Sequence, residues 1–227
     1  TEIYTLSLHD ALPIYADGLV GGVTQHYPDT IRPALQMLPL EEGTSVIAGV
    51  YMMVLPKDVV FFADTTVNIE PTAEQLAEIA ICTADEVKKL DIEPRIAMLS
   101  FSNFGSTRHP SSDKVARATQ IVKERRPDLT IDGEMQPDTA LIPEILNNVY
   151  EFNSLREKAN VLIFPSLDAG NIAMRLLRRL GGATAIGPIL IGVSKAIHVL
   201  QRDCDVEDIV NTTSLAVIDA PEHEARK

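Results

Sequence analysis

A few residues in the last third of the chain could carry out chemistry on a charged ligand. Arg179 precedes a Gly-Gly pair, Gln201 and Arg202 are adjacent, and Asp208 follows them. The planar guanidinium of arginine holds a phosphate group with two parallel hydrogen bonds, and a carboxylate can accept a proton. These residue types could therefore bind an anion and accept a proton.

Each of these residues also has a purely structural interpretation. Asp208 stands three positions after Asp205, which is typical of a capping box at a helix N-terminus. Arg179 falls in the last turn of an expected helix, where the helix dipole favours cations. On spacing alone, Arg32, in a loop before Pro33, has no claim to a site role, and Arg202 is a solvated charge. The spacing leaves both interpretations open.

Hydrophobic periodicity and turn signals predict strands that alternate with helices from Ser45 onward. The expected strands cover residues 46–55, 59–63, 95–101, 130–133 and 160–164, with the first two forming a hairpin. A capping box of Thr72 and Gln75 starts one helix, and further helices are expected over residues 112–126 and 139–150. Asp168 is expected to cap a last helix, which ends at Gly181. Its apolar side consists of Ile172, Ala173, Leu176, Leu177 and Leu180.

This alternation predicts an α/β fold with a mostly parallel, doubly wound sheet and helices on both faces. Ligands of such sheets bind beyond the carboxyl ends of the strands. The loop 102–106, a turn at Gly133–Glu134 and a turn at Pro165–Ser166 are expected at those ends. The chain has no GxGxxG motif, so a nicotinamide site in this sequence is not expected. The histidines His26, His109 and His198 and the turn residue Glu134 are assigned structural roles.

The composition restricts the class of protein and its partners. The chain has 227 residues, of which 45% are hydrophobic and 23% charged, ordinary values for a globular protein. A net charge of −12 argues against a nucleic-acid or anionic-membrane partner, whereas a small anion needs only a local arginine cluster. Cys82 and Cys204 lack metal-binding spacing and are interpreted as free thiols. No run reaches the roughly 18 apolar residues of a membrane span, so a cytoplasmic location is expected.

The first fourteen residues are interpreted as foreign to the fold. The segment TLSLHDALPI, residues 5–14, looks like the translation of a common short-read sequencing adapter. Such a segment is set aside before the fold is considered. His9 and Asp10 are therefore not candidate site residues.

Several motifs resemble one known family. The C-terminal run NVLIFPSLDAGNIAMRLLRRLGGATAIGPILIGVSKAIHVLQRDCDVEDIV and the segment DGLVGGVTQHYPDTIRPALQ are similar to the phosphate acetyltransferase and butyryltransferase family. The resemblance extends over residues 15–221. The segments SFSNFGS, DGEMQPDTAL and HVLQR most resemble the phosphotransacetylase-like C-terminal domain of NADP-dependent malic enzymes.

The resemblance implies a two-lobed fold, like that of isocitrate and isopropylmalate dehydrogenases, with a cleft for coenzyme A and an acyl phosphate. Residues 42–186 would form the second lobe, residues 15–41 and 187–221 a remnant of the first, and residues 222–227 a tail. About a hundred further residues would complete the first lobe, which lies within the usual size of a domain. We therefore expect one lobe to be incomplete.

The same resemblance assigns roles to five residues. Asp208 would be the base that takes the thiol proton of coenzyme A. Arg32, Arg179 and Arg202 would contact phosphate or the oxyanion of the tetrahedral intermediate. Gln201 stands where acyltransferases of this family carry serine. Because the loss of one oxyanion donor lowers a rate by about 10²–10³, binding is expected to survive this change better than turnover.

Three functions are compatible with these features. The first is the C-terminal domain of an NADP-dependent malic enzyme (malate to pyruvate, CO2 and NADPH) that senses acetyl-CoA without turnover of its own. NADP and a divalent metal would then be bound only by a malic enzyme catalytic domain in the same full-length chain. The second is an active phosphate acetyltransferase, which converts acetyl-CoA and phosphate to acetyl phosphate and coenzyme A. The third is a structural oligomerisation domain; a homo-oligomer is expected.

Overall fold

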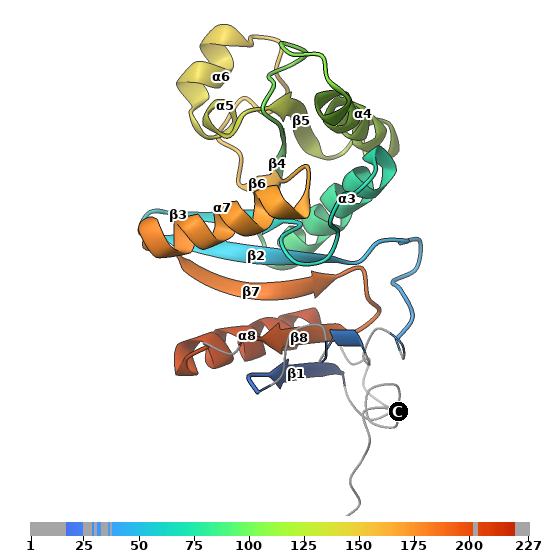
Figure 1. The fold of residues 1–227 in the computed structure, drawn as a ribbon, viewed down its shortest axis with the longest axis vertical. Coiled ribbons are helices and arrows are strands. Elements are labelled where there is room, and N and C mark those ends of the chain that lie inside the picture. Colours follow the sequence, from blue (N-terminus) through green and yellow to red (C-terminus); the bar gives the residue numbers. More distant parts are fainter. Residues whose placement is uncertain are drawn as a thin grey trace, which may run out of the picture.

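The computed structural model describes residues 17–24, 29, 31–32, 36, 38–201 and 204–220. The adapter-like residues 1–14 lie outside this part. Strands of the described part form one sheet in the order β1-β8-β7-β2-β3-β6-β4-β5 (Figure 1). The strands are β1 (Gly18–Gly22), β2 (Ala48–Leu55), β3 (Asp58–Ala63), β4 (Arg95–Leu99), β5 (Thr130–Met135), β6 (Val161–Ile163), β7 (Thr184–Ile191) and β8 (Ala196–Leu200). The helices are α3 (Ala73–Lys89), α4 (Pro110–Arg125), α5 (Pro137–Leu141), α6 (Pro143–Val149), α7 (Leu167–Leu180) and α8 (Val206–Asp219).

Parallel pairing forms both ends of the sheet, and antiparallel pairing forms its middle. β1 is parallel to β8, and β3, β6, β4 and β5 are parallel to one another in that order. β7 is antiparallel to both β8 and β2. The expected hairpin of β2 and β3 is confirmed, with Leu55 paired to Asp58 across a tight turn. The α/β class and the excess of parallel pairs agree with the sequence-based prediction.

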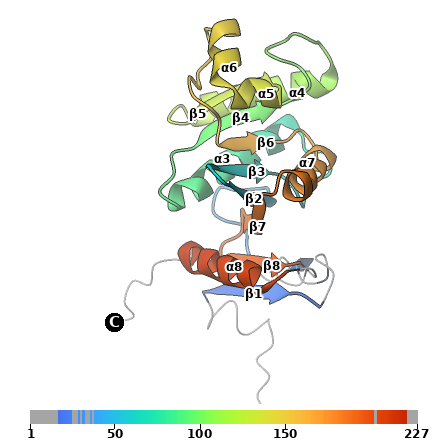
Figure 2. The ribbon, with the colours of Figure 1, turned by 90° about the vertical axis from the view of Figure 1, so that its left-hand side faces the viewer.

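Helices cover both faces of the sheet because its central strands carry apolar side chains on both sides. Successive side chains of a strand point to opposite faces. Val50 of β2 packs in a cluster with residues of α3 and α4, whereas its neighbours Tyr51 and Met53 pack in a second cluster with α6 and α7. Figure 2 shows α3 and α7 on opposite sides of β2 and β3. The doubly wound arrangement is therefore confirmed for this part of the sheet.

Of the predicted caps at two helix N-termini, one is confirmed and the other is wrong. At α3 the capping box is confirmed, because Thr72 Oγ1 accepts from Gln75 N at 3.2 Å and Gln75 Oε1 accepts from Thr72 N at 2.9 Å. At α7 the prediction was wrong. The cap is Ser166, whose Oγ accepts from Ala169 N at 3.4 Å. Asp168 lies inside the first turn, where its negative charge is favourable to the helix dipole.

The helix predicted over residues 139–150 is divided into α5 and α6. Pro143 begins α6, and a residue that precedes proline is disfavoured in the helical region. Ile142 accordingly has φ −117° and ψ 98°, which ends α5. The hydrophobic periodicity continues across this break, because only one residue, Ile142, departs from the helical conformation.

The apolar side predicted for α7 is only partly buried. Ala173 and Leu177 pack against the core, as expected. Gly170 sets the buried face, since a Cβ there would lie 2.3 Å from the carbonyl oxygen of Asp64. Three large apolar residues of the predicted side are instead more than half exposed: Ile172, Leu176 and Leu180.

Candidate functional site

The end of α7 and the segment after β8 bring arginine and glutamine side chains together. A cavity of about 150 Å³ is lined by Met174, Arg175, Arg178, Arg179 and Gln201. We name it the arginine cavity. Pockets for drug-sized ligands occupy about 300–1,000 Å³. The arginine cavity therefore suits a small anion, or one end of a larger ligand, rather than a whole coenzyme.

Asp208 completes the capping box of α8, whose N-cap is Asp205, and also contacts a site arginine. Its Oδ2 accepts from Asp205 N at 3.2 Å, and Asp205 Oδ1 accepts from Asp208 N at 2.9 Å. The structural interpretation as a capping box is therefore confirmed. The same Oδ2 lies 3.7 Å from Arg178 Nη2, and the Asp208 side chain is only 20% exposed. The Asp208 carboxylate therefore stabilises the N-terminus of α8 and also lies beside Arg178.

Asp208 lines a second cavity, which we name the aspartate cavity. Its volume is about 10 Å³, the lower limit for one water molecule. Gln201 closes it on one side, where its Nε2 donates a hydrogen bond to Tyr51 Oη. The residues that line the aspartate cavity are Tyr51, Arg178, Ala185, Gly187, Leu200, Gln201, Cys204, Asp208 and Thr212.

Two of the site residues, Arg178 and Tyr51, are not among those predicted from the sequence. Arg178 could have been found, because Arg175 and Arg178 are spaced for one side of a helix. Tyr51 could not, since 150 positions separate it from Gln201 along the chain. Its position on β2 gives only the signal of a buried aromatic residue.

Two predicted site residues are not placed at these cavities. Arg32 is exposed and lines neither the arginine cavity nor the aspartate cavity. Arg202 lies outside the described residues. Gln201, Arg179 and Asp208 are therefore the predicted site residues that the structure brings together.

The residues assigned structural roles have different outcomes, and His198 is fully buried. His109 caps α4, its Nδ1 accepting from Ser111 N at 3.1 Å, and His26 lies outside the described part. The prediction of a turn at Glu134 was wrong, because this residue is inside β5 and buried. Its Oε1 accepts from Ser102 Oγ at 2.9 Å and from Gly105 N at 2.6 Å. These hydrogen bonds satisfy the buried carboxylate, so a strand can hold it.

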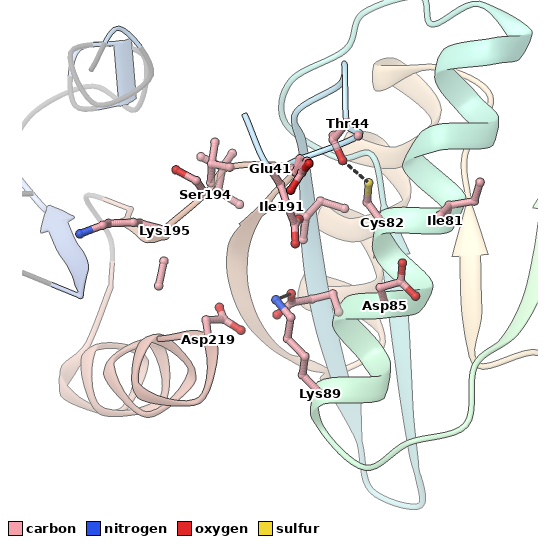
Figure 3. A pocket seen from close by; sticks show the side chains of 17 residues that line it. Glu41, Thr44, Ile81, Cys82, Asp85, Lys89, Ile191, Ser194, Lys195 and Asp219 are labelled. Atoms are coloured by element: carbon pink, nitrogen blue, oxygen red, sulfur yellow. Dashed lines mark hydrogen bonds and ion pairs between the residues drawn. The ribbon is translucent and has the colours of Figure 1, made fainter. Parts of the chain in front are cut away.

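A larger cavity, of about 370 Å³, lies between α3, the segment at Glu41 and the end of α8 (Figure 3). We name it the acidic cavity. Carboxylates exceed cations among its lining residues, which include Glu41, Glu42, Asp85, Glu86, Asp219, Lys89 and Lys195. The acidic cavity thus carries a surplus of negative charge, which disfavours anions, whereas the arginine cavity carries a surplus of positive charge.

Buried ionisable side chains adjoin the acidic cavity. Glu86 is 5% exposed, and its Oε2 accepts from Lys89 Nζ at 2.8 Å. Burial, followed by the interaction with the neighbouring Asp219, raises the pKa of Glu86 to about 8. Burial alone would raise the pKa of Asp219, but its interactions with His198 and Glu86 lower it. A protonated Glu86 therefore faces an ionised Asp219, which lies 2.9 Å from His198 Nε2.

Neither a metal cluster nor a membrane helix is found in the described ranges. No group of three or more His, Cys, Asp and Glu side chains there is arranged to hold a metal ion. No helix in those ranges combines the length and the apolar character that crossing a membrane requires.

The sheet with helices on both faces defines an α/β protein, and arginines gather at the end of α7. Comparison with known proteins gives the family. Residues 12–217 match the phosphate acetyl/butaryl transferase family, and the chain belongs to this family.

Named relatives and solved structures agree with this assignment. The chain is 45% identical over 205 residues to the phosphate acetyltransferase of Bacillus subtilis (strain 168), covering 90% of the chain and 62% of that protein. It matches a phosphotransacetylase from Streptococcus pyogenes with 43% identity and a TM-score of 0.84, covering 90% of this chain and 62% of the other. EutD phosphotransacetylase from Staphylococcus aureus matches with 36% identity and a TM-score of 0.85, covering 90% and 63%.

The predicted phosphotransacetylase-like fold is therefore confirmed. The chain spans less than two thirds of the length of each of these three proteins. Nothing in the comparisons connects it to a malic enzyme, and the expectations of NADP and of a malic enzyme catalytic domain have no support in them.

Proposed function

We propose that this chain is part of a phosphate acyltransferase that moves an acetyl group between coenzyme A and phosphate. The observation that carries the proposal is the arginine cavity beside Asp208. Arg178 and Arg179 would hold the phosphate group, since guanidinium groups bind phosphate with paired hydrogen bonds. Arg32 and Arg202 would add further phosphate or oxyanion contacts, as the family resemblance implies.

Asp208 would be the general base. In the direction of acetyl-CoA synthesis it takes the proton from the thiol of coenzyme A, and the thiolate sulfur attacks the carbonyl carbon of acetyl phosphate. The carbon–oxygen bond to phosphate then breaks, and phosphate leaves. Among the described residues, the contacts of the Asp208 carboxylate use Oδ2, so Oδ1 can accept this proton. The arginines stabilise the charge that develops on phosphate.

Replacing Asp208 with Asn tests the mechanism. We expect acetyl transfer to fall by about 10²–10⁴, the usual contribution of a positioned acid or base. Turnover is measured as thioester formation from acetyl phosphate and coenzyme A. Asp205→Asn is the matched control, because Asn caps a helix as well as Asp does. Both variants keep the cap, so a common melting temperature with loss of turnover only in Asp208→Asn would assign the chemistry. Full turnover in Asp208→Asn would refute the role of Asp208.

A second candidate is a domain that binds acetyl-CoA without turnover and regulates a malic enzyme catalytic domain in the same full-length chain. The hydrogen bond to Tyr51 favours it, because it holds in the site the side chain of Gln201, which by the family resemblance replaces a serine. The named relatives favour the acyltransferase instead. Calorimetric binding of acetyl-CoA with no thioester turnover would support the second candidate. Measurable turnover by the wild-type chain would exclude it. The homo-oligomer stays a prediction.

A further inference from the structure

Gln201 and Tyr51 form a polar contact at the centre of the candidate site. Tyr51 is 2% exposed and lies in the middle of β2, so its ring is fixed by the core around it. Its hydroxyl is held against the Nε2 of Gln201, which follows the last residue of β8. Gln201 is half-buried, and this hydrogen bond satisfies one donor of its amide. The pair therefore holds the Gln201 side chain across the site.

The two cavities meet at this side chain and at Arg178. Among the described residues, the arginine cavity and the aspartate cavity have Arg178 and Gln201 in common and no other lining residue. Arg178 is in turn paired with Asp208 at 3.7 Å. Arg175 and Arg179 thus line only the arginine cavity, Asp208 lines only the aspartate cavity, and Gln201 and Arg178 lie between them.

The volumes of the two cavities show which ligand groups each cavity can receive. The arginine cavity, at about 150 Å³, can receive a small anion, whereas the aspartate cavity, at about 10 Å³, has no room for a methyl and a carbonyl group. An acyl phosphate bound through its phosphate would therefore have to displace the Gln201 amide before its acyl carbon could approach Asp208.

We infer that Gln201, held by Tyr51, determines ligand specificity by forming a wall between the phosphate subsite and Asp208. The inference rests on the proposed function, since it takes the arginine cavity as the phosphate subsite. Because an acyl phosphate must first displace this side chain, bare phosphate binds at least as tightly as an acyl phosphate. Removing the glutamine side chain joins the two cavities into one that accepts an acyl group without this displacement.

The test compares inorganic phosphate with acetyl phosphate, each titrated calorimetrically without coenzyme A into the 227-residue chain. In the wild type we expect phosphate to bind at least as tightly as acetyl phosphate. In Gln201→Ala, acetyl phosphate should gain at least about tenfold over phosphate, the scale on which an enzyme pocket senses one small apolar group. Tyr51→Phe releases the glutamine while keeping the ring, and should shift the ratio in the same direction by a smaller factor. Gln120→Ala, at an exposed position on α4, is the control and should leave the ratio unchanged.

The outcomes separate this inference from the function on which it rests. If the wild-type chain binds phosphate but Gln201→Ala leaves the ratio of the two dissociation constants unchanged, Gln201 does not determine ligand specificity. The assignment of the phosphate subsite would be unaffected by that result. If wild-type chain binds neither ligand, both proposals fail. Should Gln201→Ala not fold, as judged by its melting temperature, the ratio in Tyr51→Phe decides, and an unchanged ratio there overturns the wall.

Discussion

Replacing Glu86 with Gln should remove most of the pH dependence of stability between about pH 4.5 and pH 8. Burial and the neighbouring Asp219 raise the pKa of Glu86 from 4.5 to about 8 in the folded chain, against the opposing effect of Lys89. In this window the folded chain keeps a proton on Glu86 that the unfolded chain has released. The free energy of unfolding therefore falls as pH rises, because the folded state binds more protons.

The magnitude follows from one proton. A difference of one bound proton changes the free energy of unfolding by about 1.4 kcal/mol per pH unit. Across the window from 4.5 to about 8 the loss reaches up to about 5 kcal/mol. The lowered pKa of Asp219 acts below this window, since its contribution is lost only as pH falls through the folded pKa, below 3.8. The two effects can therefore be separated by pH.

Urea unfolding at pH 5.5, 6.5, 7.5 and 8.5 measures the effect. The amide introduced by Glu86→Gln cannot ionise, yet it keeps a donor for Asp219 and an acceptor for Lys89. The wild-type chain should lose stability toward pH 8.5, whereas Glu86→Gln should change little. Glu74→Gln, at an exposed position in the first turn of the same helix, is the control and should follow the wild type. Parallel profiles for Glu86→Gln and the wild type would refute the assignment of the extra proton to Glu86.

Two further predictions concern the arginine cavity and the start of α3. Arg178→Ala should weaken phosphate binding by roughly ten- to a hundredfold, because a hydrogen bond to a charged group contributes about 1.5–3 kcal/mol. Calorimetry measures the dissociation constant, with Arg117→Ala at an exposed position on α4 as the control. An unchanged affinity in Arg178→Ala would show that Arg178 does not bind phosphate. Thr72→Ala should lower the free energy of unfolding by about 1 kcal/mol through loss of the cap, whereas Thr72→Ser should retain it. Equal urea midpoints for the two Thr72 variants would contradict the capping role.

Local signals in the sequence were sufficient for most elements of the fold. Thr72 and Gln75 lie within one turn of each other, so the capping box could be predicted from neighbours alone. The hairpin of β2 and β3 is likewise set by two apolar runs and a short turn. Local signals failed where two interpretations competed, as at Asp168, where Ser166 provides the cap, and where Pro143 interrupts the helix predicted over residues 139–150.

The sequence by itself also determined that Asp208 could cap α8 and that arginines gather at the end of α7. Only the tertiary structure decided which arginine meets Asp208 and which residue closes the site. Tyr51 and Gln201 meet because β2, β7 and β8 are neighbours in the sheet, and this order depends on packing between distant segments. The same holds for Glu86 and Asp219, which α3 and α8 bring together. A cap needs only a few consecutive residues, whereas these contacts need the registers of several strands to be fixed at once.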